Sequence, residues 1–141
     1  MAKQTAEDGT VTHSHYLASP LENEELLANT CSLCHNGTVQ PELAGLVASI
    51  QAATEARTNT IGNQLADLTD MLAKAVESGN YTDEQLAEVR QLARDAQFYW
   101  DFVFVENSEG AHNSALTNEC LDNAEKLCVE AFAALVAVQN T

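Results

Sequence analysis

The sequence has few basic residues, with 6 Lys and Arg against 21 Asp and Glu, and its formal net charge is −15. A surface this acidic repels nucleic acid and anionic lipid headgroups, so we expect neither as a partner. It suits a basic partner, divalent cations or simple solubility. Long apolar runs are also missing, and none approaches the roughly 18 residues of a membrane-spanning helix. Residues 1–15 contain no apolar run of the kind found in a secretory signal.

Aromatic residues are scarce as well, at 6% of the chain, and many of the apolar residues are alanine. Alanine buries little surface, so we expect a thin core that a cofactor, a partner or a further segment completes. Apolar residues still make up 45% of the 141 residues, which argues against disorder throughout and suggests one domain by length.

Three segments follow one another along the chain. Residues 1–12 are polar and small, which is typical of a tail or linker. Residues 13–40 hold three of the four histidines and two of the four cysteines, and we expect loops with short helical turns. Residues 41–141 are helical by pattern, so the predicted fold class is mostly α.

The helical region predicts a long hairpin and a third helix. Pro41 suits the first turn of a helix, which should end near Ser78-Gly79-Asn80, where a left-handed stop is favoured. Its apolar positions recur in steps of three and four: Leu43, Leu46, Val47, Ile50, Ala53, Ile61, Leu65, Leu68, Leu72 and Val76.

The second helix begins with a capping box, in which Thr82 bonds forward and Gln85 reaches back. Residues 102–105 are rich in β-formers, but we expect helix there because no other segment offers a pairing strand. Asn113 or Ser114 can cap the third helix. Helices this long need a partner along their length, either within the hairpin or in a second copy of the chain.

The motif Cys31-Ser32-Leu33-Cys34-His35 has the pattern C-x-x-C-H of covalent haem attachment. Two thiols at this spacing reach the two vinyl groups of a haem and form thioethers. The histidine that follows lies under the iron and supplies its proximal nitrogen. The sequence therefore predicts haem c, held by Cys31, Cys34 and His35.

Two alternatives stay open for the same residues. A structural zinc site also uses C-x-x-C, but it needs two further ligands, of which His35 and one more histidine are candidates. A haem-free helical module that acts only as a dimer contact is the other. A thioredoxin-like redox motif would need a βαβ context, which the pattern lacks.

The remaining histidines are candidates for the sixth position of an iron. His15 precedes the apolar pair Tyr16-Leu17, and His112 stands at a helix start after a chain break, so both are favoured over His13 in the polar tail. Two imidazoles on one iron leave no open site, so such a haem carries electrons and binds no substrate.

Cys120 and Cys128 lie eight residues apart on the third helix. A rise of about 1.5 Å per residue separates them by roughly 12 Å, which is too far for a disulfide. We expect both thiols to be free and buried.

These motifs resemble those of the ammonia-forming cytochrome c nitrite reductases, which are pentahaem periplasmic enzymes. In that family a histidine, three residues and Ser-Pro-Leu precede the final C-x-x-C-H, as His15 and Ser19-Pro20-Leu21 do here. The stretch "AQFYWDFVFVENSEGAHNS" is similar to the family's Trp-Asp pair and Gly-x-His-Asn, through Trp100-Asp101 and Gly110 to Asn113. The resemblance covers residues 10–138.

By this resemblance, Cys31, Cys34 and His35 hold the last of five haems. His15 and His112 are then distal ligands of neighbouring haems, whose attachment motifs belong to an upstream region. The sixth ligand of the haem on His35 would also come from upstream. The resemblance implies a multihaem-cytochrome-type haem loop, followed by the helical hairpin and the third helix, with a homodimer formed through the long helices.

The chain lacks the C-x-x-C-K motif of the family's catalytic haem, and Ser114 stands where the family usually has proline. The resemblance thus implies the C-terminal third of the enzyme, as a fragment or a separate chain. Its function would be electron transfer within a six-electron reduction of nitrite to ammonia in the periplasm. Its partners would be the rest of the multihaem enzyme and a redox donor protein.

Overall fold

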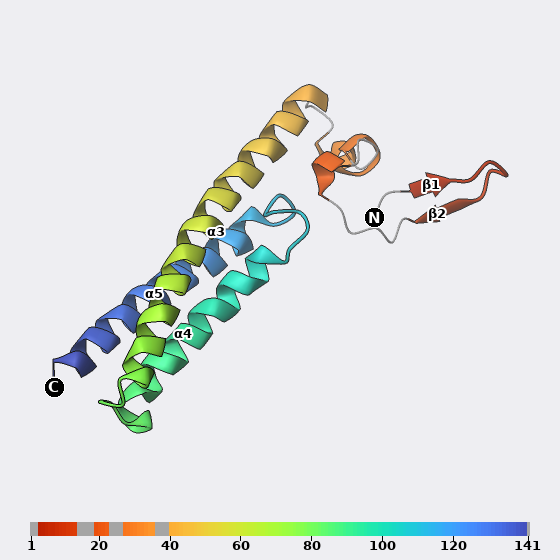
Figure 1. The fold of residues 1–141 in the computed structure, drawn as a ribbon. Helices are drawn as coiled ribbons and strands as arrows, with labels where there is room; N and C mark the ends of the chain where they lie inside the picture. Colours follow the sequence, from red (N-terminus) through yellow and green to blue (C-terminus); the bar gives the residue numbers. More distant parts are fainter. Residues whose placement is uncertain (1–2, 14–18, 23–26, 36–39, 141) are drawn as a thin grey trace. The chain divides into compact units, whose positions relative to one another are not determined.

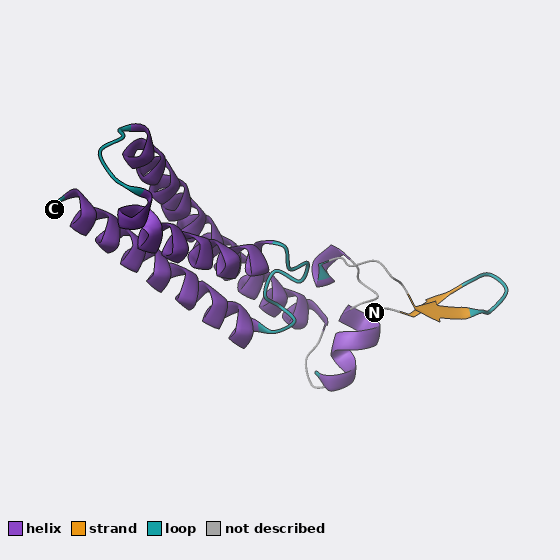
Figure 2. Ribbon diagram, turned by 90° about the horizontal axis from the view of Figure 1, so that it is seen from below, coloured by secondary structure: helices purple, strands orange, loops and turns teal. Residues whose placement is uncertain are grey.

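The structure is a computed structural model of the 141-residue chain, and it describes residues 3–13, 19–22, 27–35 and 40–140. Helices dominate these residues, which confirms the mostly α fold class (Figures 1 and 2). Length suggests one domain, but the chain divides into two compact units. One comprises residues 1–53 and 106–114, and the other residues 54–105 and 115–141. The division into segments 1–12, 13–40 and 41–141 stays a prediction.

A β-hairpin occupies most of the polar first segment. Strands β1 (Lys3–Thr5) and β2 (Val11–His13) pair antiparallel, with Lys3 opposite His13. The turn between them uses Gly9 at a φ of 82°, a conformation that glycine adopts without strain. The Asp8 carboxylate accepts a hydrogen bond of 2.9 Å from the amide of Thr10 and so closes the turn. The sequence analysis does not foresee these strands.

Short helical turns fill the described parts of the segment that carries the C-x-x-C-H motif. They are η1 (Pro20–Glu22), the π-helical turn η2 (Leu27–Cys31) and α2 (Ser32–Cys34). Their shortness agrees with the expected loop-rich character.

The longest helix is α3 (Gln40–Glu77), which includes Pro41 in its first turn as predicted. It ends where the sequence predicts, because Gly79 adopts a left-handed φ of 66°. The amide of Gly79 donates to the carbonyl of Val76 at 3.2 Å, which satisfies one of the last helical carbonyls.

Helix α4 (Asp83–Phe104) begins with the predicted capping box. The Thr82 hydroxyl accepts from the amide of Gln85 at 3.3 Å, and the Gln85 side chain accepts from the amide of Thr82 at 2.8 Å. The helix runs through the aromatic stretch, so helix is confirmed there. The stated reason is incomplete, because the chain does contain strands, and these pair with each other.

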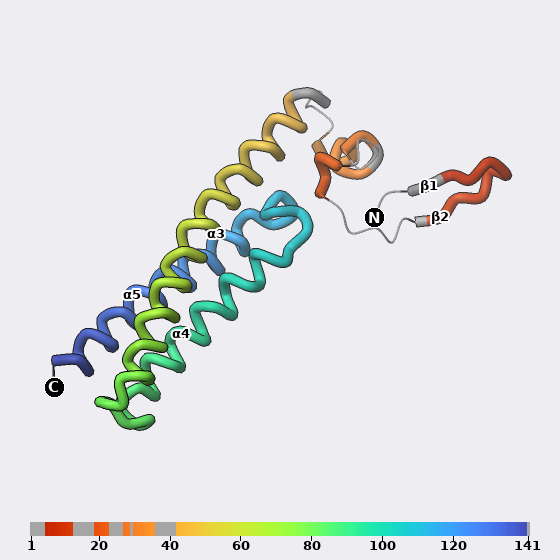
Figure 3. The backbone as a smooth tube through the Cα atoms, in the orientation of Figure 1, coloured from red at the N-terminus to blue at the C-terminus, as the bar shows by residue number. Residues whose placement is uncertain are grey.

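Helix α5 (Ser114–Gln139) follows a turn formed by residues 106–113, along which the tube in Figure 3 can be followed from α4. Ser114 is the first helical residue, which places Asn113 at the predicted cap position. Within the second unit, α4, α5 and the later part of α3 lie side by side (Figures 1 and 2).

Two apolar clusters form the core of this helical unit. The buried members of the first are Ile61, Ala96, Val103, Cys120, Leu121, Ala124 and Cys128. Those of the second are Leu68, Ala75, Leu86, Val89, Ala131 and Leu135. Four of these are alanines, in keeping with the thin core that the composition predicts. Cys120 and Cys128 are free and buried, as expected.

Not every position of the predicted apolar stripes faces the core. Leu46 and Val76 are 50% and 46% exposed. Beside Val76 it is Ala75 that is buried, because mixed steps of three and four residues do not determine which residue faces the core near a helix end.

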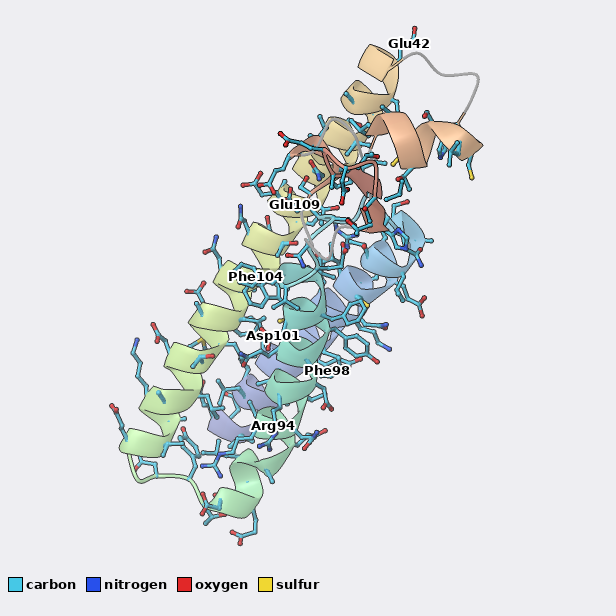
Figure 4. All side chains as sticks on the ribbon, turned by 90° about the vertical axis from the view of Figure 1, so that its right-hand side faces the viewer. Glu42, Arg94, Phe98, Asp101, Phe104 and Glu109 are labelled. Carbon is cyan, nitrogen blue, oxygen red and sulfur yellow. The ribbon has the colours of Figure 1, made fainter. Side chains whose placement is uncertain are left out.

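Trp100 links α4 to α3 inside the helical unit. Its indole nitrogen donates to the carbonyl of Thr58 at 2.7 Å, and its ring stacks on Phe104 with centroids 4.6 Å apart. Gly62 provides the space for the ring, because a Cβ at this position would lie 3.1 Å from Trp100 Cζ2. Figure 4 labels Phe98 and Phe104 along the same helix, both more than half exposed.

The close contact between Gly62 and the Trp100 ring predicts that alanine has opposite effects on the free energy of unfolding at two glycines of α3. Gly45→Ala meets nothing within 4 Å and should raise the free energy of unfolding by about 1 kcal/mol through helix propensity. Gly62→Ala should lower it, because Trp100 is held by its hydrogen bond and its stacking and cannot move away freely. Denaturant unfolding followed by circular dichroism measures both, and equal stabilisation by the two variants would contradict the packing argument.

Candidate functional site

The C-x-x-C-H motif lies on a short helical turn. Cys31 ends η2, and the amide of His35 donates to the carbonyl of Cys31 at 3.0 Å, which extends the helical bonding through the motif. Cys31 and Cys34 are three residues apart on this turn, so they lie on one side of it. Both thiols are free.

An apolar cluster anchors one side of the motif. Leu27, Leu43 and Val47 are its buried members, and Cys31 packs against them. Cys34 and His35 are exposed, and Leu33 between the cysteines is 73% exposed. The turn is therefore fixed through Cys31, while its other reactive side chains face outward.

The same cluster reaches the turn that contains His112. Ala111 packs against the cluster, so the neighbour of His112 and the first motif cysteine share one apolar contact region. The His112 side chain is exposed, and its amide donates to the Ser108 hydroxyl at 2.9 Å. Of the other predicted ligands, His15 lies outside the described residues, and so does the Tyr16-Leu17 pair after it. His13 belongs to β2.

Glu106 organises this turn through its carboxylate. One oxygen accepts from the Ser108 amide at 2.9 Å, and the other from the Ser108 hydroxyl at 2.6 Å and the Gly110 amide at 3.1 Å. Glu109 and Gly110 adopt left-handed φ values of 54° and 84°, so the backbone turns sharply around the carboxylate. A charged acceptor with three donors is a strong local constraint.

These hydrogen bonds set the acidity of Glu106. Partial burial by itself would raise its pKa, but the bonds from Ser108 and Gly110, with the nearby charge of His112, bring the pKa below its ordinary value of 4.5. By contrast, burial raises the pKa of the Cys120 and Cys128 thiols, with Glu119 and Glu125 adding to the effect. Those two thiols are poor nucleophiles in the folded protein.

Gln51 connects the Glu106 turn to the chain after His15. Its side-chain nitrogen donates to the Ser19 hydroxyl at 2.6 Å and to the Ser108 carbonyl at 3.1 Å, and all three residues are buried. The sequence analysis overlooks Gln51 and Glu106. A signal for Gln51 is present, since it follows Val47 by four residues and so holds a polar side chain at a core-facing step of α3.

No arrangement of three or more His, Cys, Asp or Glu side chains suited to a metal ion exists in the described part of the chain. The described residues also include no helix with the length and apolarity of a membrane span.

The hydrogen bonds of Glu106 predict that the stability of this turn depends on pH. Because its folded-state pKa is lowered, ionised Glu106 stabilises the turn above its ordinary pKa of 4.5, and this stabilisation is lost as the pH falls through the lower folded-state pKa. The amide proton of Ser108 should report the titration in NMR spectra with a midpoint below 4.5. Glu106→Gln should abolish it, and a midpoint at or above the ordinary value would contradict the hydrogen-bond assignment.

Comparison with known proteins places the motif in a family context. The family model described as cytochrome c552 matches residues 1–141, the whole chain. The cytochrome c nitrite reductase subunit NrfA of Nitratidesulfovibrio vulgaris is 26% identical over 138 residues. That match covers 94% of this chain but 26% of the relative, so the chain spans about a quarter of the relative's length. The match to the family model over the full chain shows that the chain belongs to the cytochrome c552 family.

Proposed function

We propose that the chain is a c-type haem-binding electron-transfer segment of an ammonia-forming nitrite reductase. The observation that carries the proposal is the C-x-x-C-H motif with both thiols free, in a chain of the cytochrome c552 family. The similarity to the cytochrome c nitrite reductase subunit of Nitratidesulfovibrio vulgaris supports the reaction class.

The chemistry of the donor set fits haem c. Cys31 and Cys34 supply two thiols on one side of a turn, and His35 supplies an imidazole directly after them. Thioether attachment needs the thiols at two vinyl groups and only the imidazole at the iron, so the three side chains need not converge on one point. The exposure of Cys34, Leu33 and His35 leaves space for a porphyrin face, and exposed Leu33 offers it an apolar contact.

When bound, such a haem supplies a one-electron carrier. In the proposal, Cys31 and Cys34 tether it, and the apolar cluster of Leu27, Leu43 and Val47 holds the tether in place. His35 would hold the iron as the proximal ligand. His15 and His112 would be distal ligands, either to neighbouring haems or to this one.

The remaining parts of the proposal concern the complete protein. Reduction of nitrite to ammonia takes six electrons, and we assign this chemistry to the complete multihaem enzyme because this chain has no C-x-x-C-K motif. A redox donor protein, a homodimer formed through the long helices and a periplasmic location belong to the same proposal. Covalent haem attachment normally occurs outside the cytoplasm, which supports the location.

Haem attachment is tested by expressing the chain in a periplasm that matures c-type cytochromes. Intact mass spectrometry should show the polypeptide plus one haem, and the pyridine haemochrome spectrum should be of the c type. Cys31→Ala with Cys34→Ala should remove the haem. Cys120→Ala with Cys128→Ala is the matched control, because these thiols are buried in the core of the helical unit, and it should retain the haem. The bare polypeptide mass in all samples would refute the proposal.

Distal ligation is tested on the haem-loaded chain by replacing histidines. Changing His13, His15 and His112 together to alanine should convert a low-spin visible spectrum to high-spin, because the iron loses its sixth imidazole. Single replacements identify which histidine is bound, with His15 and His112 expected to matter more than His13. A low-spin spectrum that survives the triple replacement would contradict ligation from within this chain.

A further inference from the structure

Gln51 is a buried polar side chain whose two amide hydrogens both have partners in the first compact unit. It lies in α3, is 6% exposed, and donates to Ser19 Oγ at 2.6 Å and to the Ser108 carbonyl at 3.1 Å. A carbonyl oxygen only accepts, so the nitrogen end of the amide must face Ser108. The orientation of the Gln51 amide is thereby fixed by its surroundings.

The hydrogen bonds of Gln51 offset the free energy cost of burying its primary amide. They also join segments far apart in sequence, since Ser19 is 32 and Ser108 is 57 residues from Gln51. Such a buried, satisfied polar contact specifies one arrangement of the segments that it joins.

One partner of Gln51 leads directly to a candidate ligand. Ser108 comes four residues before His112. Its hydroxyl accepts from the His112 amide at 2.9 Å and donates to the Glu106 carboxylate at 2.6 Å. Fixing Ser108 therefore limits where the backbone of His112 can lie.

We propose that Gln51 is a positioning residue that holds the turn of His112 in place through Ser108, so that the His112 imidazole is presented to haem iron in a set orientation. The inference rests on the proposed haem-binding function. It goes beyond that function by assigning the orientation of this ligand to a residue outside the haem-attachment motif.

The sharpest variant is Gln51→Glu, which keeps the size and shape of the side chain but replaces the amide donors with a carboxylate. The carboxylate cannot bond to the Ser108 carbonyl and is repelled by it, whereas the Ser19 hydroxyl can still donate to it. Gln97→Glu on α4 is the matched control, because it makes the same chemical change at an exposed position. Ser19→Ala is the milder variant, which removes one partner of Gln51 and leaves the bond to Ser108 in place.

The first measurement is hydrogen exchange on the haem-free chain. Gln51→Glu should accelerate exchange about tenfold in peptides covering residues 106–112, because this segment loses a buried hydrogen bond. Ser19→Ala should accelerate exchange only in residues 19–22, and Gln97→Glu in neither segment. Unchanged exchange in residues 106–112 of Gln51→Glu would overturn the positioning of this turn by Gln51.

The second measurement uses the haem-loaded protein and compares electron paramagnetic resonance spectra at equal haem content. Gln51→Glu should shift the g values of the low-spin signal or convert part of it to high-spin, and Gln97→Glu should not. A purely structural role would lower the yield of folded protein without changing the signal of the folded fraction, and that result would overturn the positioning role. Loss of haem from the unmodified chain would instead refute the proposed function, while the exchange result would stand.

Discussion

The apolar contact between Leu27, Leu43 and Val47 is the interaction on which the candidate site depends. It holds Cys31 on one side and Ala111 on another, so a motif near residue 31 and a turn near residue 111 are ordered by the same few side chains. The motif segment has too little regular structure to be stable without this contact, since η2 and α2 together cover only residues 27–34. The rigid start of α3 supplies the surface against which both are packed.

Polar contacts complete what this small cluster begins. Glu106 satisfies three donors in a turn whose backbone adopts left-handed angles, and Gln51 connects that turn to Ser19. The helical unit uses a different solution, in which alanines allow helices to approach closely and Trp100 fills the space above Gly62. Small residues keep the core thin, so a few large side chains carry much of the packing.

Much of the fold could be predicted because its signals are local. The capping box of Thr82 and Gln85 spans four residues, and the stop at Gly79 needs only one. The roles of Cys31, Cys34 and His35 are also legible from spacing, although they stay predictions. The periodicity of α3 places Gln51 at a core-facing step but does not give its partners, because these are brought together by folding. Glu106 could not be found in this way, because its role depends on the local turn geometry. The hairpin of β1 and β2 was missed because its strands are only three residues long, too short for a periodic signal.

The burial of Cys120 and Cys128 has a consequence for maturation. A chain with four thiols can form wrong disulfides while it is unfolded in an oxidising compartment, and four cysteines allow three fully paired patterns. Once α5 packs, Cys120 and Cys128 are buried and their pKa values are raised, so they no longer form disulfides with Cys31 and Cys34. Early assembly of the helical unit would therefore protect against wrong disulfides and leave Cys31 and Cys34 as the thiols available for the proposed haem attachment.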